Sequence, residues 1–309
     1  MIINTGMRTD IPAYYSEWFM NRIKEGYVLV RNPYFNEQVT RYRLSPDVVD
    51  LIAFCTKNPA PMLGHLGELK RYSMFWFVTI TPYGADIEKN VPPIPAVTEA
   101  FKRLSQAVGI NCVSLRYDPI FIDETYTVDY HINAFEHLLN NLSGYTGQAV
   151  ISFIDLYAKT VKNFPGIREV RPDERNRIGK AFSQIGKSYG VTIRSCCEGT
   201  DLSKYGIHVS GCMTKEILEK AVGYSLAIPK KDNPRQNCNC ILGHDIGAYN
   251  TCGHLCRYCY ANYDEKLVKE NMRRHIKTSP FLIGQSQPSD IIHDACQKSY
   301  FTGQMILQL

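Results

Sequence analysis

The sequence predicts an α/β fold, a (β/α)8 TIM-like barrel followed by a cysteine-rich C-terminal segment. Over the first two thirds of the 309 residues, short β-rich segments alternate with helical patterns, which is typical of βαβ units and a parallel sheet. Polar residues follow the predicted strands, at the place where a barrel builds its active site. Beyond that region the pattern changes to a loop-rich segment that is dense in Cys, Gly and Asn.

The predicted strands and helices alternate along the chain. Strands are expected near Met1–Asn4, Tyr27–Arg31, Val49–Cys55, Met74–Thr81, Cys112–Arg116, Ala149–Ile154, Val191–Ser195 and Ile207–Val209. Helices are expected at Pro12–Lys24, Pro61–Leu69, Ile94–Val108, Val128–Leu142 and Asp173–Tyr189. Several of these helices begin with proline or an acidic residue, as helix starts prefer. Their number and length fit a barrel better than an open sheet, but periodicity alone does not exclude the open sheet.

Changes in this pattern divide the chain into three regions. Residues 1–225 form the predicted barrel, residues 226–280 form the cysteine-rich segment, and residues 281–309 form a tail. A short helix is expected at Asp264–Arg274, inside the cysteine-rich segment. We expect that segment to pack on the mouth of the barrel, where the polar strand ends lie.

Charge, the N-terminal stretch and the cysteine count indicate which partners and which compartment to expect. The formal net charge is +5, from 35 basic and 30 acidic residues, which is too small an excess to indicate a nucleic-acid partner by itself. The N-terminal stretch lacks the features of a signal peptide, and no apolar run approaches the roughly 20 residues of a membrane helix. We therefore expect a cytoplasmic protein with no membrane partner, whose eleven cysteines serve metal binding rather than a disulfide framework.

The strongest motif is a C-x3-C-x2-C array formed by Cys252, Cys256 and Cys259. Three thiolates at this spacing can bind three irons of a [4Fe-4S] cluster and leave the fourth iron open to an external ligand. The alternative is a structural zinc site completed by Cys240 or His254. We favour the cluster because zinc sites usually show two C-x2-C-like pairs, whereas this array is a triplet.

Four further cysteines are enough to supply all the ligands of a second metal site. They are Cys197, Cys212, Cys238 and Cys240, with Cys196 as a substitute for its neighbour. Four thiolates form either a closed second [4Fe-4S] cluster or a structural zinc site. Alternatively, Cys238 or Cys240 is the fourth ligand of the first cluster. The spacing leaves these alternatives open, and the remaining cysteines at positions 55, 112 and 296 receive no function.

Short polar and proline-containing stretches recur along nearly the whole chain: Arg8–Pro12, Arg31–Pro33, Thr56–Pro59, Thr81–Gly84, Arg116–Ile120, Ser152–Phe153 and Asp245–Tyr249, which leads into the cysteine triplet. Together these stretches resemble the domain-of-unknown-function family DUF1848. The chain departs from the family pattern at Cys55 and Leu115, where that pattern has tryptophan. Tyr258–Ala261 is also similar to the cluster motif of the spore photoproduct lyase branch of radical-SAM proteins. In that branch the cysteines precede the barrel, so the resemblance implies a circular permutation.

The resemblance implies that the open iron binds S-adenosylmethionine and that an electron from the cluster cleaves it to a 5'-deoxyadenosyl radical. By analogy, Lys57 and Arg116 are the expected partners of the cofactor carboxylate. Asp118 or Asp155 is the expected partner of the cofactor amine or of its ribose hydroxyls. The remaining expected cofactor contacts are Thr81, Tyr258 and Tyr260. The same resemblance implies that a protein of the flavodoxin or ferredoxin type supplies the electron and that the enzyme is sensitive to oxygen.

The substrate and the reaction stay open at this point. The candidates for a general acid or base are Asp10, Asp118, Asp155, Glu198 and Tyr83, of which we favour Asp118, Asp155 and Tyr83 as catalytic residues. The expected substrate is a small molecule or is derived from nucleic acid. Two other functions compete: a zinc- or cluster-stabilised nucleic-acid-binding protein, and an iron–sulfur hydro-lyase that uses the open iron as a Lewis acid.

Overall fold

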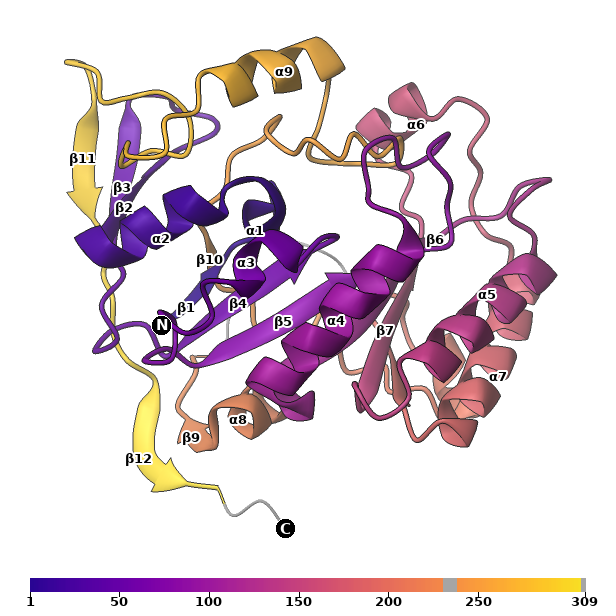
Figure 1. Cartoon of the computed structure of the whole chain (residues 1–309). Helices are drawn as coiled ribbons and strands as arrows, with labels where there is room; N and C mark the ends of the chain where they lie inside the picture. Colours follow the sequence, from indigo (N-terminus) through magenta and orange to yellow (C-terminus); the bar gives the residue numbers. More distant parts are fainter. Residues whose placement is uncertain (230–237, 307–309) are drawn as a thin grey trace.

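A seven-stranded sheet, in which every pair of neighbouring strands is parallel, forms the centre of the molecule (Figure 1). The computed structural model describes residues 1–229 and 238–306. In spatial order the strands are β10 (His244–Asp245), β1 (Ile2–Asn4), β4 (Leu51–Thr56), β5 (Met74–Thr79), β6 (Val113–Ile120), β7 (Gln148–Phe153) and β8 (Thr192–Ser195).

Helices cover both faces of this sheet. They are α1 (Ile11–Tyr14), α2 (Ser16–Glu25), α3 (Ala60–Leu63), α4 (Ile94–Val108), α5 (Val128–Asn141), α6 (Ala158–Asn163), α7 (Pro172–Ser188), α8 (Lys215–Val222) and α9 (Glu265–Arg273), with the 3-10 turns η1 (Ile110–Cys112) and η2 (Asp201–Tyr205). Figure 1 shows α4, α5 and α7 together on one face. Threonine or aspartate side chains cap the N-termini of α5, α8 and α9, which fixes where these helices begin.

Alternation along the strands sorts their residues onto two faces. In β4, Ile52 and Phe54 join the large core beneath α4, α5 and α7. Leu51 and Ala53 point to the opposite face and join a second core with α8. Cys55 shares the parity of Leu51 and Ala53, so its side chain belongs to the second face. This second face carries the candidate site.

The eight-stranded closed barrel is not confirmed. Within the described part of the chain the seven-stranded sheet is open, because its edge strands β10 and β8 pair only with β1 and β7. The strand expected at Ile207–Val209 is reduced to one isolated bridge between Arg194 and His208. A single bridge adds no strand that could reach the other edge, so the correct description is an α/β fold with a large parallel sheet.

The strand expected at Tyr27–Arg31 forms as β2, but it lies outside the large sheet. It pairs antiparallel with β3 (Gln38–Arg43), which in turn pairs with β11 (Ile291–Asp294). The connection from β2 to β3 is too short for the crossover that a parallel pair requires, so the chain forms a hairpin instead. The place beside β1 goes to β10, which the sequence did not predict.

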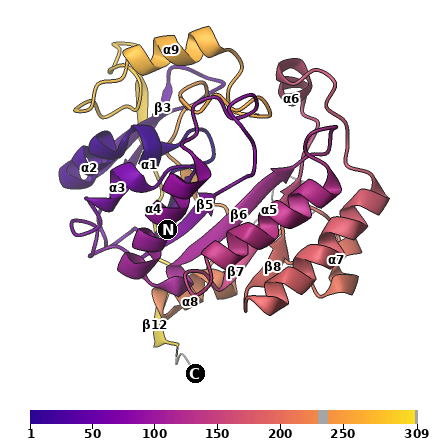
Figure 2. The same cartoon turned by 45° about the vertical axis from the view of Figure 1, so that its right-hand side comes forward.

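The cysteine-rich segment and the tail both contribute to sheets. The segment of residues 226–280 adds β10 to the edge of the large sheet and ends with α9. The tail adds β11 to the small sheet and pairs β12 (Phe301–Met305) with β9 (Tyr224–Leu226). Figure 2 shows α6 and α9 at the same end of the large sheet. Among the described residues, none of the helices combines the length and the apolar character that crossing a bilayer demands.

Candidate metal centres and their shared cavity

One cavity of about 380 Å³ lies on the second face of the sheet and reaches both groups of cysteines. Most of the strand residues that line it share the parity of this face, namely Asn4, Cys55, Phe77, Thr79, Arg116 and Ser152, and the strand-end residues Thr56, Pro119 and Phe153 join them. The loops after the strands supply Lys57 and Asp155. Because these strands are parallel, their carboxyl ends meet at one edge, and polar side chains from distant parts of the sequence gather there.

The triplet Cys252, Cys256 and Cys259 occupies one part of the cavity wall. Its loop is held by backbone hydrogen bonds from Asn90 N to His254 O (3.0 Å) and from Arg257 N to Ile87 O (2.9 Å). Asn250 and Leu255 adopt φ angles of 55°, which turn the chain sharply around the array. The loop also packs against α6, since Thr160 Oγ1 donates to Tyr258 O at 3.3 Å. The three thiols therefore come from a loop that the protein fixes at several points.

Gly253 allows this loop to lie against α1. A Cβ atom at this position would stand 2.7 Å from Cε1 of the Tyr14 ring, closer than side chains tolerate. Only glycine fits between Cys252 and His254 without moving that ring.

His254 lies in the cavity wall, but its side chain anchors the loop and is not a free ligand. Its Nε2 donates to Asp10 Oδ2 at 2.9 Å, and its Nδ1 lies 3.1 Å from the Tyr14 hydroxyl. Asp10 is also the N-cap of α1 and accepts a hydrogen bond from the backbone N–H of Lys57 at 2.7 Å. The imidazole is 2% exposed, and both of its nitrogens have partners, so it is poorly placed to complete a zinc site.

Lys57 forms the centre of a buried polar network beside the triplet. Its Nζ donates to Glu88 Oε1 at 2.8 Å and to Thr81 Oγ1 at 3.0 Å, and the Tyr258 hydroxyl donates to the same Glu88 oxygen. Burial opposes the positive charge of Lys57, but the adjacent Glu88 carboxylate outweighs it, so the pKa of Lys57 stays above its ordinary value. The network places a stable cation next to Cys256.

Burial raises the pKa of all three thiols of the triplet. Lys57 opposes this effect at Cys256, and Asp10 adds to it at Cys252. The backbone N–H of Ala261 points to Cys259 Sγ at 3.4 Å, the kind of hydrogen bond that tunes cluster thiolates. Without a cation these thiols keep their protons, whereas a bound metal would replace the protons.

Arg116 and Asp118 form an ion pair in the cavity wall, with Nη2 and Oδ2 2.5 Å apart. The Arg116 guanidinium also lies over the ring of Phe77, 5.2 Å from its centroid. Asp155 is exposed and lies at the rim of the cavity. Tyr260 also lines the cavity and donates its hydroxyl proton to Met7 O at 2.5 Å. With Lys57 and Tyr258, six of the expected catalytic and cofactor residues thus share the cavity with the triplet.

Three of the residues proposed for acid–base or cofactor roles lie behind the cavity wall. Tyr83 is buried in the core, where its hydroxyl donates to Pro119 O at 2.7 Å and accepts from Phe121 N at 3.2 Å. Thr81 is buried and reaches the site only through Lys57 and Glu88. Glu198 accepts from Phe153 N at 2.7 Å and pairs with Arg175, while burial raises the pKa of Glu198 to about 7.

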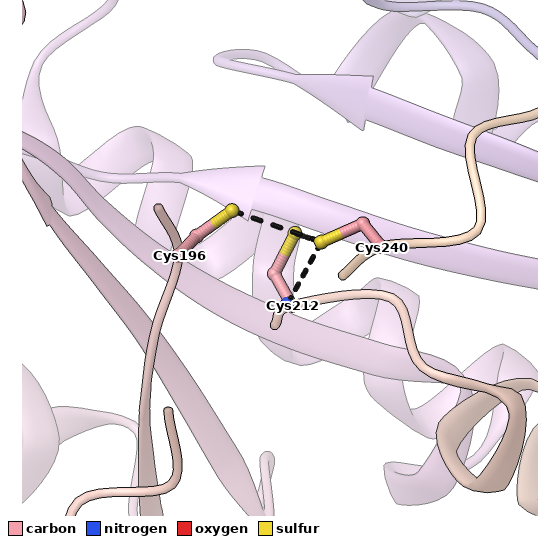
Figure 3. A group of neighbouring side chains, drawn as sticks. All are labelled: Cys196, Cys212 and Cys240. Carbon is pink, nitrogen blue, oxygen red and sulfur yellow. Dashed lines mark hydrogen bonds between the residues drawn. The ribbon is translucent and has the colours of Figure 1, made fainter. Parts of the chain in front are cut away.

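The second group of cysteines is more compact than the triplet, and Figure 3 shows three of its members. The sulfur atoms of Cys196, Cys212 and Cys240 all lie within 4.8 Å of one another. Cys240 Sγ lies 3.7 Å from Cys196 Sγ and 3.2 Å from Cys212 Sγ. These separations exceed the roughly 2.05 Å of a disulfide. Among the residues with described positions, this is the one trio of potential ligands that is so close together.

Cys196, the substitute in the sequence analysis, lies at the centre of this group. Cys196 Sγ interacts with the thiols of Cys197, Cys212, Cys238 and Cys240. Cys197 has a φ of 63°, an uncommon conformation for a residue with a side chain, and its sulfur lies 3.7 Å from that of Cys196. In an extended strand, neighbouring side chains point to opposite faces. The turn at Cys197 instead brings two consecutive thiols together.

Comparison with protein families gives one match. The model of the family described as "Domain of unknown function (DUF1848)" matches residues 2–261. The chain belongs to this family. No curated protein and no solved structure matches. The region that matches DUF1848 contains both cysteine groups and ends shortly after Cys259, so the whole cavity lies inside the family domain.

The sequence analysis missed the residues that hold the DUF1848 cavity in shape. Glu88, which links Lys57 to Tyr258, lies in a loop and in no motif. Asn90 holds the backbone of the triplet loop, and Tyr14 contacts His254. No spacing signal marks these side chains, because their partners lie far away in the sequence.

Proposed function

We propose that the chain is an iron–sulfur enzyme of the radical-SAM type, with a [4Fe-4S] cluster on Cys252, Cys256 and Cys259 and S-adenosylmethionine in the shared cavity. The observation that carries this proposal is the position of the triplet, which lines one cavity together with charged side chains at the carboxyl ends of parallel strands. A volume of about 380 Å³ falls within the usual range of ligand pockets.

The spacing of the thiols supports a cluster rather than a zinc ion. Thiolates that share one zinc ion are in contact with each other, whereas thiolates on a cubane each bind a different iron and lie farther apart. Within the described residues, the triplet is not among the groups whose ligand atoms lie within 4.8 Å of one another. Both candidates for a fourth zinc ligand are also engaged elsewhere: His254 with Asp10, and Cys240 with the second group.

The cavity residues suit the polar groups of S-adenosylmethionine. When bound, an open-iron cluster supplies an electron that starts radical chemistry on this cofactor. Arg116 offers a guanidinium for the methionine carboxylate, and Asp118 and Asp155 offer carboxylates for its amine or for ribose hydroxyls. Lys57 already pairs with Glu88, so we assign it mainly to fixing the wall and balancing the charge near Cys256.

The same chemistry defines the partners and the location that we propose. A protein reductant of the flavodoxin or ferredoxin type would supply the electron, and the substrate would be a small molecule or a nucleic-acid derivative. All eleven cysteines are free, which suits the reducing cytoplasm.

Electron paramagnetic resonance of the anaerobically purified, dithionite-reduced protein tests the proposal. We expect a [4Fe-4S] signal that shifts when S-adenosylmethionine is added and is lost in Cys256→Ala. The matched control is Cys296→Ala, since Cys296 is exposed and outside the cavity; it should keep the signal. An intact cluster that never responds to the cofactor would instead favour the hydro-lyase, and zinc without any cubane signal would exclude both enzymes.

A further inference from the structure

We propose that the compact cysteine group is a second and different metal centre, a single zinc ion bound by the thiolates of Cys196, Cys212, Cys238 and Cys240. This centre is separate from the cluster of the proposed function and does not depend on it. The observation behind it is the packing of thiols from three chain segments into one small volume.

The distances fit one ion rather than a cubane. Four thiolates around zinc at about 2.3 Å in a tetrahedron have sulfur atoms separated by about 3.8 Å. The Cys196–Cys240 separation is 3.7 Å and the Cys212–Cys240 separation is 3.2 Å. A cubane would need to push these sulfurs apart, because each thiolate binds its own iron. The group is already close to the arrangement that zinc requires.

Cys238 is the best fourth ligand. Its thiol interacts with those of Cys196 and Cys240, two members of the trio. The thiol of Cys197 interacts with those of Cys196 and Cys238. We place Cys197 outside the ligand set, in the turn beside Cys196 that its φ of 63° marks.

The surroundings indicate a structural ion. Cys196, Cys212 and Cys240 are buried and belong to the apolar core formed with Leu51, Phe75 and α8. A tetrahedral zinc with four thiolates has no open position for a substrate. It would instead join three segments: the end of β8, the turn before α8, and the chain after residue 237. These segments supply one part of the cavity wall.

Metal analysis of the full-length protein, purified anaerobically with zinc and iron in the medium, tests this inference. We expect about one zinc and about four irons per chain. Cys212→Ser should lose the zinc and keep the iron, and Cys256→Ala should lose the iron and keep the zinc. Cys197→Ser is the matched control, since it removes a neighbouring thiol and should keep both metals.

Substitution by Co²⁺ gives a second measurement that does not depend on any substitution in the zinc site itself. A four-thiolate Co²⁺ site produces strong thiolate-to-metal absorption and the visible bands of tetrahedral coordination, and both should be present in Cys256→Ala. About eight irons without zinc would overturn the inference in favour of a second cubane. Zinc retained in Cys212→Ser, or lost in Cys197→Ser, would overturn the ligand set. The absence of iron with one zinc retained would refute the proposed function alone.

Discussion

The two cysteine groups line the same cavity, yet they are built in opposite ways. The triplet comes from eight consecutive residues, and its thiols are surrounded by charged and polar side chains such as Lys57, Glu88 and Asp10. The compact group comes from three separate segments and lies in an apolar core. The difference teaches that one loop can place three thiols on a polar cavity wall, whereas the compact group exists only because folding brings three separate segments together.

The electrostatic environment also differs between the two ends of the cavity. Near the triplet, the buried Lys57–Glu88 pair provides fixed charges beside Cys256, whereas Arg116 of the Arg116–Asp118 pair interacts with Cys196 and Cys212. Around Cys212 and Cys240, most neighbours are aliphatic and aromatic side chains, with Arg116 as a charged neighbour of Cys212. We therefore expect substitutions of Lys57 and Glu88 to affect the triplet end and leave the compact group unchanged.

The largest expected effect in this comparison is that of Lys57→Met. Glu88 is 3% exposed, and removing its partner would leave a buried carboxylate unpaired, which costs about 3–5 kcal/mol in the free energy of unfolding. Urea denaturation of the wild type and the variant measures this loss. The iron content should fall while the zinc content stays constant.

A double variant and a matched lysine test the reason for that loss. Lys57→Met combined with Glu88→Gln should recover part of the stability, because the unpaired charge is gone. Lys89, the residue after Glu88, forms an exposed ion pair with Glu265. Lys89→Met breaks this pair and should change the free energy of unfolding little. If Lys57→Met and Lys89→Met lowered the free energy of unfolding equally, the assignment of a buried network around Lys57 would be contradicted.

The next largest effect is expected for His254→Ala. This change leaves Asp10 and Tyr14 without their buried partner and frees the triplet loop, at a cost of about 2–4 kcal/mol. Iron per chain should decrease, whereas zinc should stay at its wild-type value. His65→Ala is the control, because His65 is only partly buried and contacts Glu68 on the surface. Unchanged iron in His254→Ala would show that the loop does not need this anchor.

The smallest effect concerns pH and separates global unfolding from metal loss. Burial lowers the pKa of His131 to about 4. In the folded protein the neutral ring accepts a hydrogen bond from the Tyr117 hydroxyl and donates one to Phe121 O. The unfolded chain binds a proton near pH 6.5 and the native chain does not, so stability falls as the pH drops from 6.5 towards 4. At pH 5 the resulting loss in the free energy of unfolding is about 2 kcal/mol.

The variant His131→Gln should flatten this part of the pH dependence, measured as urea midpoints from pH 7 to pH 4.5. In that background, acid release of iron and zinc reports on the thiols rather than on unfolding, which sharpens the comparison of the two centres. An identical pH dependence in wild type and variant would rule out His131 as the source.

Much of the local structure was predictable from the sequence. The expected helix at Ile94–Val108 has the bounds of α4, and the helix expected at Asp173–Tyr189 differs from α7 by one residue at each end. The helix expected at Pro12–Lys24 is instead divided into α1 and α2 around Tyr15. Periodicity reports which residues are buried, so long amphipathic helices are predicted best.

The closed barrel is the main expectation that the structure does not confirm, and the reason is physical. Strand patterns do not specify which strands become neighbours, and the segment Tyr27–Arg31 has the same pattern in a hairpin as in a parallel sheet. The two-residue strand β10 was too short to produce any pattern, yet it takes the place beside β1.

The sequence by itself determined the alternating α/β architecture, the DUF1848 membership and the triplet, because these depend on order and spacing along the chain. Only the tertiary structure decided the open sheet, the shared cavity, the partners of Lys57 and His254, and the central position of Cys196. Each of these depends on contacts between residues far apart in sequence. Spacing along the chain carries no information about such contacts, whereas folding fixes them through burial and hydrogen bonding.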